Sequence, residues 1–184
     1  MKEISLNILD IAENSVKAGA SLTEIYVDED GDTLTLTIKD DGHGMDEETL
    51  KSVTDPFYTT RKTRKVGLGV PLLKLACEQT GGSFSVTSST DSTAHGTTVT
   101  AVFNKNHIDF TPLGDVIASI VTLIQGHPYT DFLFRHRIED AVVALDTREI
   151  REVLEDVPLD TYEVITWIRD NLIDQYDELN NKKI

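Results

Sequence analysis

The sequence predicts an α+β fold, a two-layer α/β sandwich in which helices cover one face of a mixed β-sheet. Apolar residues recur at helical spacing in residues 4–17 and 70–80, which indicates two amphipathic helices. Each of these stretches is followed by two short segments with the alternation and β-branched residues typical of strands. The order of one helix and two strands, repeated after a long loop, favours a sheet with its helices on one side.

Each of these elements has its own signal. In the first helix, Ile4, Ile8 and Ile11 share one face, and Gly19 is the expected C-cap. The first two strands flank a turn at residues 29–32, and the second helix ends at a glycine pair. The elements expected in order are a helix over 4–17, strands over 25–27 and 34–38, a helix over 70–80, and strands over 84–88 and 97–103.

The chain divides near residues 104–112. We expect a first domain over residues 1–106 and a small, mainly helical α/β annex over residues 107–184. The annex holds 16 acidic and 7 basic residues and no recognisable catalytic motif. A packing or partner-docking role for the annex is therefore favoured over a second active site.

Local patterns outline the annex. Apolar residues at helical spacing predict a helix over residues 116–124. Two strands should form a hairpin that turns at Glu139-Asp140. Asp146 with Glu149, and Asp160 with Glu163, each match a capping box, which predicts two further helices.

Composition excludes several classes of partner. The net charge of -15 argues against nucleic acid or an anionic membrane as the main partner. The single cysteine excludes an internal disulfide framework and fits a reducing compartment. The chain starts without an apolar signal core, and no run approaches the roughly 20 apolar residues of a membrane span. We expect a cytoplasmic protein.

A polar stripe on the first helix is the first candidate for a binding site. Asp10, Asn14 and Lys17 follow one another at about one helical turn. An Asn side-chain oxygen is a hard ligand that Mg²⁺ accepts together with phosphate oxygens and water. The alternative is that these residues form only the solvated side of the helix.

A glycine-containing turn follows the second strand, in the sequence Asp40-Asp41-Gly42-His43-Gly44. A carboxylate at the end of a strand can accept a hydrogen bond from an exocyclic amine such as adenine N6. Gly42 and Gly44 would let the backbone approach a flat base without interference from a Cβ atom. The alternative is an ordinary Asp-Gly turn, and His43 has no expected role.

Basic residues cluster in an otherwise acidic chain. Arg61, Lys62, Arg64 and Lys65 stand directly before Gly67-Leu68-Gly69, where the second helix begins. A helix N-terminus with free amides is a ready site for an anion. The cluster therefore indicates a segment that faces phosphates.

These motifs together resemble an ATP-binding domain of the GHKL superfamily, which includes type II topoisomerases, MutL proteins and sensor histidine kinases. The resemblance covers residues 6–103 and implies the Bergerat α/β sandwich. The matching boxes, in order, are Asn14-Ser15-Val16-Lys17-Ala18-Gly19-Ala20, Asp40-Asp41-Gly42-His43-Gly44, Asp55-Pro56-Phe57-Tyr58-Thr59-Thr60-Arg61, Gly67-Leu68-Gly69-Val70 and Gly96-Thr97-Thr98.

The resemblance implies ATP and Mg²⁺ as cofactors and assigns roles to the matching residues. Asn14 would ligate Mg²⁺, and Asp40 would bind the adenine amine, with Thr97 completing that contact through water. Gly44 would line the base pocket, and Phe57 would pack beside it.

The resemblance also implies a lid over the phosphates, formed by residues 58–69. Lys17 sits where related kinases place a lysine that contacts phosphate. The lid residues expected to contribute to nucleotide binding are Thr60, Arg61, Lys62, Gly67, Leu68 and Gly69.

Two departures from the family pattern concern catalysis. Hydrolysing members carry a Glu four residues before the Asn, where this chain has Asp10, which is one methylene shorter and remains the candidate general base. In the lid, Lys65 stands where kinases often have a glycine. None of the five histidines lies in the His-Glu-x-x-x-Pro pattern of a kinase acceptor, so a phosphoacceptor would lie on another protein.

Three functions remain open. The first is a stand-alone histidine-kinase-like ATPase or protein kinase that acts on a partner protein. The second is an ATP-gated switch that changes the annex or a homodimer interface, and the third is a nucleotide sensor without catalysis. The full-length sequence also resembles small anaerobe ATP-binding proteins encoded beside iron hydrogenases, which implies a redox-enzyme subunit as partner.

Overall fold

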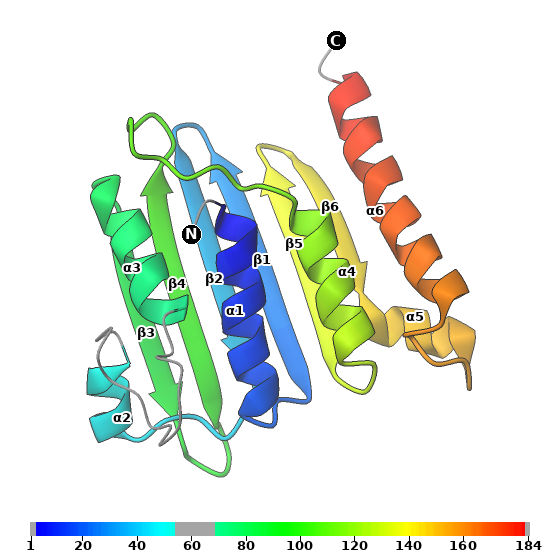
Figure 1. The fold of residues 1–184 in the computed structure, drawn as a ribbon, viewed down its shortest axis with the longest axis horizontal. Coiled ribbons are helices and arrows are strands. Elements are labelled where there is room, and N and C mark those ends of the chain that lie inside the picture. The colour runs from blue at the N-terminus through cyan, green and yellow to red at the C-terminus, as the bar shows by residue number, and fades with distance from the viewer. Residues whose placement is uncertain (1–2, 54–68, 183–184) are drawn as a thin grey trace.

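The computed structural model describes residues 3–53 and 69–182, which form one sheet with helices packed on it (Figure 1). The helices are α1 Ile4–Lys17, α2 Glu47–Ser52, α3 Gly69–Gln79, α4 Val116–Gly126, α5 Thr147–Leu154 and α6 Tyr162–Lys182. The strands are β1 Leu22–Asp30, β2 Thr33–Asp40, β3 Ser83–Ser89, β4 Gly96–Asn104, β5 Asp131–Ile138 and β6 Ala141–Asp146.

The six strands form a single mixed sheet in the order β3-β4-β2-β1-β5-β6. Neighbouring strands are antiparallel except for β1 and β5, which pair in parallel, with Ile25 opposite Phe134. The predicted α+β class with a mixed sheet is therefore confirmed.

Three helices, α3, α1 and α4, lie side by side on one face of the sheet (Figure 1). Their apolar stripes pack on alternating strand residues, since one side chain in two points to that face. Ile8 of α1, Leu73 of α3 and Leu123 of α4 are completely buried, as are Ile25 and Phe134 of the sheet. The core is therefore the layer between these helices and the sheet, and α1 is held at its centre.

The elements predicted for the first half agree with the structure to within a few residues. Gly19 follows α1 with a φ of +74°, the left-handed conformation expected after a helix end. The short helix α2 was not predicted. Asp46 caps it by accepting a hydrogen bond of 2.8 Å from the backbone N–H of Thr49.

The C-terminal half adds to the same sheet. The predicted hairpin is confirmed, with β5 and β6 joined at Glu139 and Asp140. Because β5 pairs with β1, the sheet is continuous across residue 106, and the domain boundary placed there stays a prediction. The connecting segment also reaches α1, whose first backbone N–H groups at Ile4 and Ser5 donate to the carbonyls of Pro112 and Leu113.

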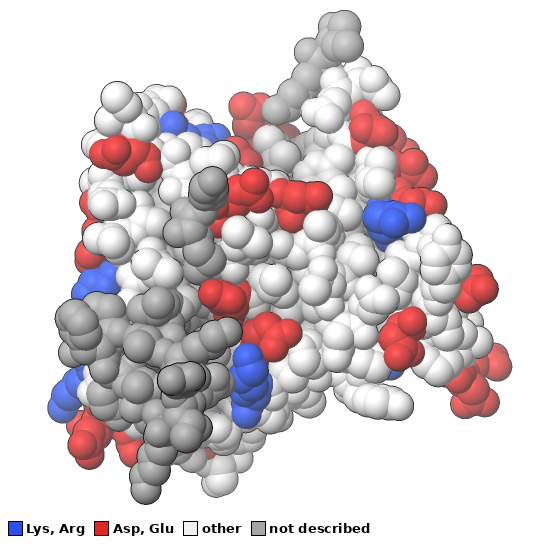
Figure 2. Space-filling model, viewed as in Figure 1, with Lys and Arg blue, Asp and Glu red and all other residues white. Residues whose placement is uncertain are grey.

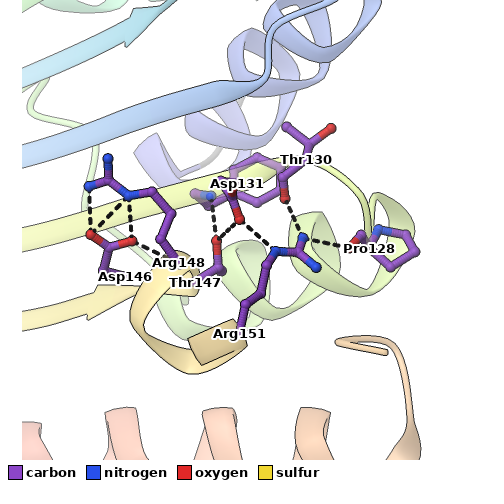
Figure 3. Close-up of polar contacts among 8 residues, drawn as sticks. Pro128, Thr130, Asp131, Asp146, Thr147, Arg148 and Arg151 are labelled. Carbon is purple, nitrogen blue, oxygen red and sulfur yellow. Dashed lines mark hydrogen bonds and ion pairs between the residues drawn. The ribbon is translucent and has the colours of Figure 1, made fainter. Parts of the chain in front are cut away.

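Polar contacts at the start of helix α5 and one turn later, at Arg151, fix the helix (Figure 3). Asp146 caps the helix by accepting from the backbone N–H of Arg148 at 3.0 Å, as predicted for the start of a helix at this residue. Arg151 donates to Asp131 Oδ1 at 2.8 Å and to the carbonyl oxygen of Pro128 at 2.6 Å. These contacts hold the loop before β5 against α5.

Helix α6 packs on α4 and β6. Within residues 3–53 and 69–182, no helix is both long enough and apolar enough to cross a membrane.

Candidate functional site

The carboxylate of Asp40 is held by three donors at the end of β2. Its Oδ1 accepts from the backbone N–H groups of Gly42 at 2.9 Å and Thr97 at 3.2 Å. Its Oδ2 accepts from the hydroxyl of Ser15 on α1 at 2.7 Å. A carboxylate offers about four acceptor positions. One position on Oδ2 therefore remains for a ligand amine, and the predicted adenine-binding residue is rigidly oriented.

Glycines around Asp40 allow the backbone segments to approach closely. A Cβ atom at Gly44, where φ is +72°, would lie 1.9 Å from the carbonyl oxygen of Ser89. A Cβ atom at Gly42 would lie 2.9 Å from Cβ of Ala18 at the end of α1. The glycines predicted to make room for a base thus also let the turn pack against the end of α1 and against the end of β3.

Thr97 connects this turn to the edge of the sheet. It pairs with Asp40 across β2 and β4, and its hydroxyl lies 2.8 Å from the hydroxyl of Ser88. Ser88 in turn accepts from the backbone N–H of Met45 at 2.8 Å and donates to the carbonyl of Gly96 at 2.9 Å. The structure therefore brings Thr97 and Asp40 together, as predicted, with Ser88 as an additional polar partner.

The polar stripe predicted on α1 is exposed. The side chains of Asp10, Asn14 and Lys17 lie on the surface of the helix rather than in the core. Ser15, the residue after Asn14, is buried and bonded to Asp40, the residue predicted to bind adenine. The bond from Ser15 therefore fixes the part of α1 that carries Asn14 relative to Asp40.

The N-terminus of α3 lies against the middle of α1. A Cβ atom at Gly69, the first residue of α3, would lie 3.1 Å from Cβ of Asp10 and 3.6 Å from its Oδ2. The first backbone N–H groups of an 11-residue helix carry partial positive charge at this end. Asp10 and the start of α3 are therefore neighbours, as a shared phosphate-binding region requires.

Lys17 makes an ion pair within α1. Its Nζ lies 3.3 Å from Oε2 of Glu13, while Oε1 of Glu13 lies 2.6 Å from Nε2 of His127 at the end of α4. The hydrogen bond from His127 is the main cause that lowers the pKa of Glu13, and Lys17 adds to the effect, whereas burial opposes it. Glu13 is therefore a carboxylate at neutral pH, shared between two donors.

The residues described suit a Mg²⁺ ion held mainly by a nucleotide. In this part of the chain, no group of three or more His, Cys, Asp or Glu side chains could hold a metal by itself. Mg²⁺ commonly keeps several waters and binds one or two protein oxygens together with substrate phosphates. The exposed amide oxygen of Asn14 fits that mode.

Part of the predicted site lies outside the described residues. This concerns the phenylalanine box, the basic cluster and most of the lid. The predicted binding residues in these segments are Phe57, Thr60, Arg61, Lys62, Gly67 and Leu68.

A cavity of about 340 Å³ lies beside the turn that follows β2. His43 and His95 line it, together with Ala18, Gly19, Asp41 and Thr90. Both histidines bind backbone carbonyls through Nδ1, that of Gly44 at 2.6 Å and that of Gly42 at 2.8 Å. Because a carbonyl only accepts, these bonds place a proton on each Nδ1, and the histidines fix the turn.

Sequence reasoning missed Ser15 and Ser88. Ser15 is a polar residue on the buried side of an amphipathic helix, which is a signal that it needs a polar partner. No comparable signal marks Ser88, which stands in an alternating strand with other serines and threonines.

Comparisons with known proteins agree with this geometry. Residues 2–107 match the family model described as histidine kinase-, DNA gyrase B-, and HSP90-like ATPase. Sporulation kinase E of Bacillus subtilis (strain 168) is 34% identical over 88 residues, which are 48% of this chain and 12% of that protein. Sensor protein SrrB of Staphylococcus aureus (strain NCTC 8325 / PS 47) is 36% identical over 93 residues, which cover 48% of this chain and 16% of that protein. The chain thus matches only a small part of the length of these relatives.

Two solved structures share the fold. The N-terminal domain of a DNA repair protein superposes with a TM-score of 0.57 at 16% identity, covering 79% of this chain and 53% of that chain. The Aquifex aeolicus MutL ATPase domain complexed with ADP superposes with a TM-score of 0.54 at 13% identity, covering 84% of this chain and 70% of that chain. Both structures cover a larger share of this chain than residues 1–106 make up, so the common fold includes residues of the C-terminal part.

Proposed function

This chain belongs to the histidine kinase-, DNA gyrase B-, and HSP90-like ATPase family, and we propose that it binds Mg-ATP and passes the γ-phosphoryl group to a partner protein. Membership confirms the resemblance to the GHKL superfamily and the Bergerat sandwich. It also supports ATP as the ligand, since ATP binding is the common property of these domains. The Mg²⁺ ion, the transfer step and its acceptor are the proposed part.

The hydrogen bond between Ser15 and Asp40 is the observation that carries the proposal. It fixes a carboxylate with one free acceptor position, which suits the exocyclic amine of adenine. It also ties that carboxylate to the part of α1 that carries Asn14, the residue before Ser15. The adenine end of the proposed site, on β2, and its metal end, on α1, are thereby held together.

The phosphate end of the site would lie between α1 and the start of α3. Asn14 would hold Mg²⁺, which neutralises phosphate charge when it is bound. Backbone N–H groups at the start of α3 would face phosphate oxygens, and Lys17 would add a positive charge one turn after Asn14. Asp10, next to Gly69, is the candidate base for activating water.

A protein acceptor is favoured over water for two reasons. Asp10 is shorter than the glutamate of hydrolysing family members, which places its carboxylate farther from a water at the γ-phosphate. None of the five histidines of this sequence lies in a His-Glu-x-x-x-Pro pattern, so the acceptor would be a side chain of another protein. We propose slow ATP hydrolysis as the side reaction.

An ATP-gated switch is the second candidate. Helix α1 carries Asp10, Asn14 and Lys17, and it packs against both α3 and α4. A nucleotide that moved α1 would therefore move the C-terminal half as well. A partner protein, such as a redox-enzyme subunit, or a second copy of the chain would bind differently as a result. For the kinase and for the switch alike, we propose a cytoplasmic protein that has neither nucleic acid nor a membrane as its partner.

Incubation with γ-labelled ATP separates these functions. The protein is incubated with labelled ATP, Mg²⁺ and a lysate of its host, and label is followed on proteins and as free phosphate. A kinase labels a protein in the lysate, whereas a switch releases phosphate without labelling, and a sensor does neither. The Asp40→Asn variant is the control, since loss of adenine binding should remove every signal that depends on this chain.

A further inference from the structure

A line of contacts connects the C-terminal half of the protein to Lys17. His127 caps the end of α4, and its Nε2 lies 2.6 Å from Oε1 of Glu13 on α1. The other oxygen of Glu13 lies 3.3 Å from Nζ of Lys17, one turn further along the helix. One carboxylate therefore serves two donors, one from each half of the chain.

The backbone around His127 is held by α4, by the loop before β5 and by α5. His127 binds the carbonyl of Leu123 through its own N–H at 3.0 Å, and its carbonyl accepts from Thr130 at 3.1 Å. Arg151 of α5 donates to the carbonyl of Pro128 at 2.6 Å, which directly follows His127 (Figure 3). The loop that carries His127 is thus held in place by the C-terminal half of the chain.

Competition for Glu13 controls the charge that Lys17 presents. A lysine paired with a carboxylate at i−4 offers less net positive charge to a phosphate than a free lysine does. His127 fixes one oxygen of Glu13 and draws the carboxylate toward α4. Without His127, both oxygens of Glu13 could turn to Lys17.

We propose that His127 is a positioning residue of the nucleotide site, which acts through Glu13 to leave Lys17 available for the phosphates of ATP. This inference rests on the proposed function, because it takes Lys17 as a phosphate contact. It gives the C-terminal half a defined route to the site: a partner that shifts α5 or the loop before β5 would change the affinity for ATP. Figure 2 shows Asp and Glu side chains together with Lys, Arg and neutral surface on this face of the molecule.

A double-mutant cycle tests the route. Mg-ATP and adenosine affinities are measured by calorimetry for the wild type, His127→Ala, Lys17→Ala and the double variant. We expect His127→Ala to weaken Mg-ATP binding about three- to fivefold, the scale of an exposed ion pair, and to leave adenosine binding unchanged. In the Lys17→Ala background, His127→Ala should have no further effect.

Two more variants distinguish positioning from a structural role. Glu13→Gln should strengthen Mg-ATP binding, because it releases Lys17, whereas a purely structural pair would weaken binding when either partner is lost. His127→Gln keeps a donor for Glu13 and should restore most of the affinity. His107→Ala, which changes a histidine that lies near Asp109 and makes no hydrogen bond or ion pair with Glu13 or Lys17, is the matched control and should have no effect.

Each result bears on the inference. Equal losses from His127→Ala with and without Lys17, or a parallel loss of adenosine binding, would overturn the role of His127 while the proposed function stands. A wild-type protein that does not bind Mg-ATP would overturn both.

Discussion

Ser15 donates a hydrogen bond of 2.7 Å to Asp40, although the two residues stand 25 positions apart. Ser15 is buried on the inner side of α1, and Asp40 ends β2. The bond therefore ties the helix that carries Asn14 to the carboxylate that would recognise adenine. A site of this kind depends on a fixed position of the helix relative to the strand, because small displacements of binding groups strongly weaken the binding of a ligand.

Loss of the Ser15 hydroxyl should weaken nucleotide binding without unfolding the protein. In Ser15→Ala, Asp40 keeps its two backbone donors but gains freedom at Oδ2. We expect the Kd for ATP to rise about fivefold, the equivalent of one hydrogen bond of about 1 kcal/mol. Calorimetry measures the change, and Thr122→Ala, which removes an exposed hydroxyl on α4, should leave the Kd unaltered.

Asp10 should affect turnover and leave binding intact. Asp10→Asn retains the size of the side chain and removes the basic carboxylate that lies beside Gly69. Steady-state phosphate release should fall by about 100-fold or more, while the Kd for ATP changes less than about threefold. Unchanged phosphate release in Asp10→Asn would exclude Asp10 as the base.

The turn after β2 should not tolerate a side chain at Gly44. In Gly44→Ala, the new Cβ atom would meet the carbonyl oxygen of Ser89 at 1.9 Å, and the φ of +72° adds strain. We expect a loss of more than about 3 kcal/mol in the free energy of unfolding. Gly31→Ala is a matched control, because Gly31 also has a positive φ but open space around it, and should lose only about 1 kcal/mol. Urea unfolding compares the two, and equal losses would contradict the steric account.

Stability should fall in acid because of Glu29. His136, almost completely buried, contacts Tyr176 of α6 through Nδ1 at 2.7 Å and Glu29 through Nε2 at 3.1 Å. The hydrogen bond from His136 and the contact with Lys105 lower the pKa of Glu29 from about 4.5 to about 2, against the opposing effect of burial. A carboxylate with a depressed pKa in the folded state stabilises the fold above pH 4.5, and the stabilisation is lost as the pH falls toward 2.

Unfolding free energies measured between pH 5 and pH 3 test this expectation. The wild type should lose on the order of 2 kcal/mol from this group, and Glu29→Gln should show a correspondingly flatter pH profile. Glu47→Gln, which changes a fully exposed carboxylate of α2, should keep the wild-type profile. Identical profiles for Glu29→Gln and the wild type would remove Glu29 as the cause.

Local patterns predicted the elements of the first half well, because helix periodicity and strand alternation are properties of short segments. The bounds of α1 and the turn at Gly19 follow from such patterns. Helix α2 escaped prediction because it is only six residues long and buries none of its side chains, so it has no apolar face to detect.

Contacts between distant segments could not be predicted in the same way. The parallel pairing of β1 with β5 joins strands about a hundred residues apart, and no local signal specifies such a partner. The contacts of Ser15 with Asp40 and of His127 with Glu13 have the same character. Family motifs identified Asp40, Asn14 and Thr97 in the sequence. The side chains that contact Asp40 and Thr97, those of Ser15 and Ser88, were found only in the structure.

Discrimination between ATP and ITP by the wild-type protein tests the central claim most directly. ITP differs from ATP at the base, where a carbonyl oxygen replaces the amine that Asp40 would accept. Calorimetric titration in Mg²⁺ should show ATP binding at least about tenfold more tightly than ITP, because the Asp40 carboxylate would face a second acceptor in ITP. Equal affinities for the two nucleotides, or no binding of ATP, would contradict the account.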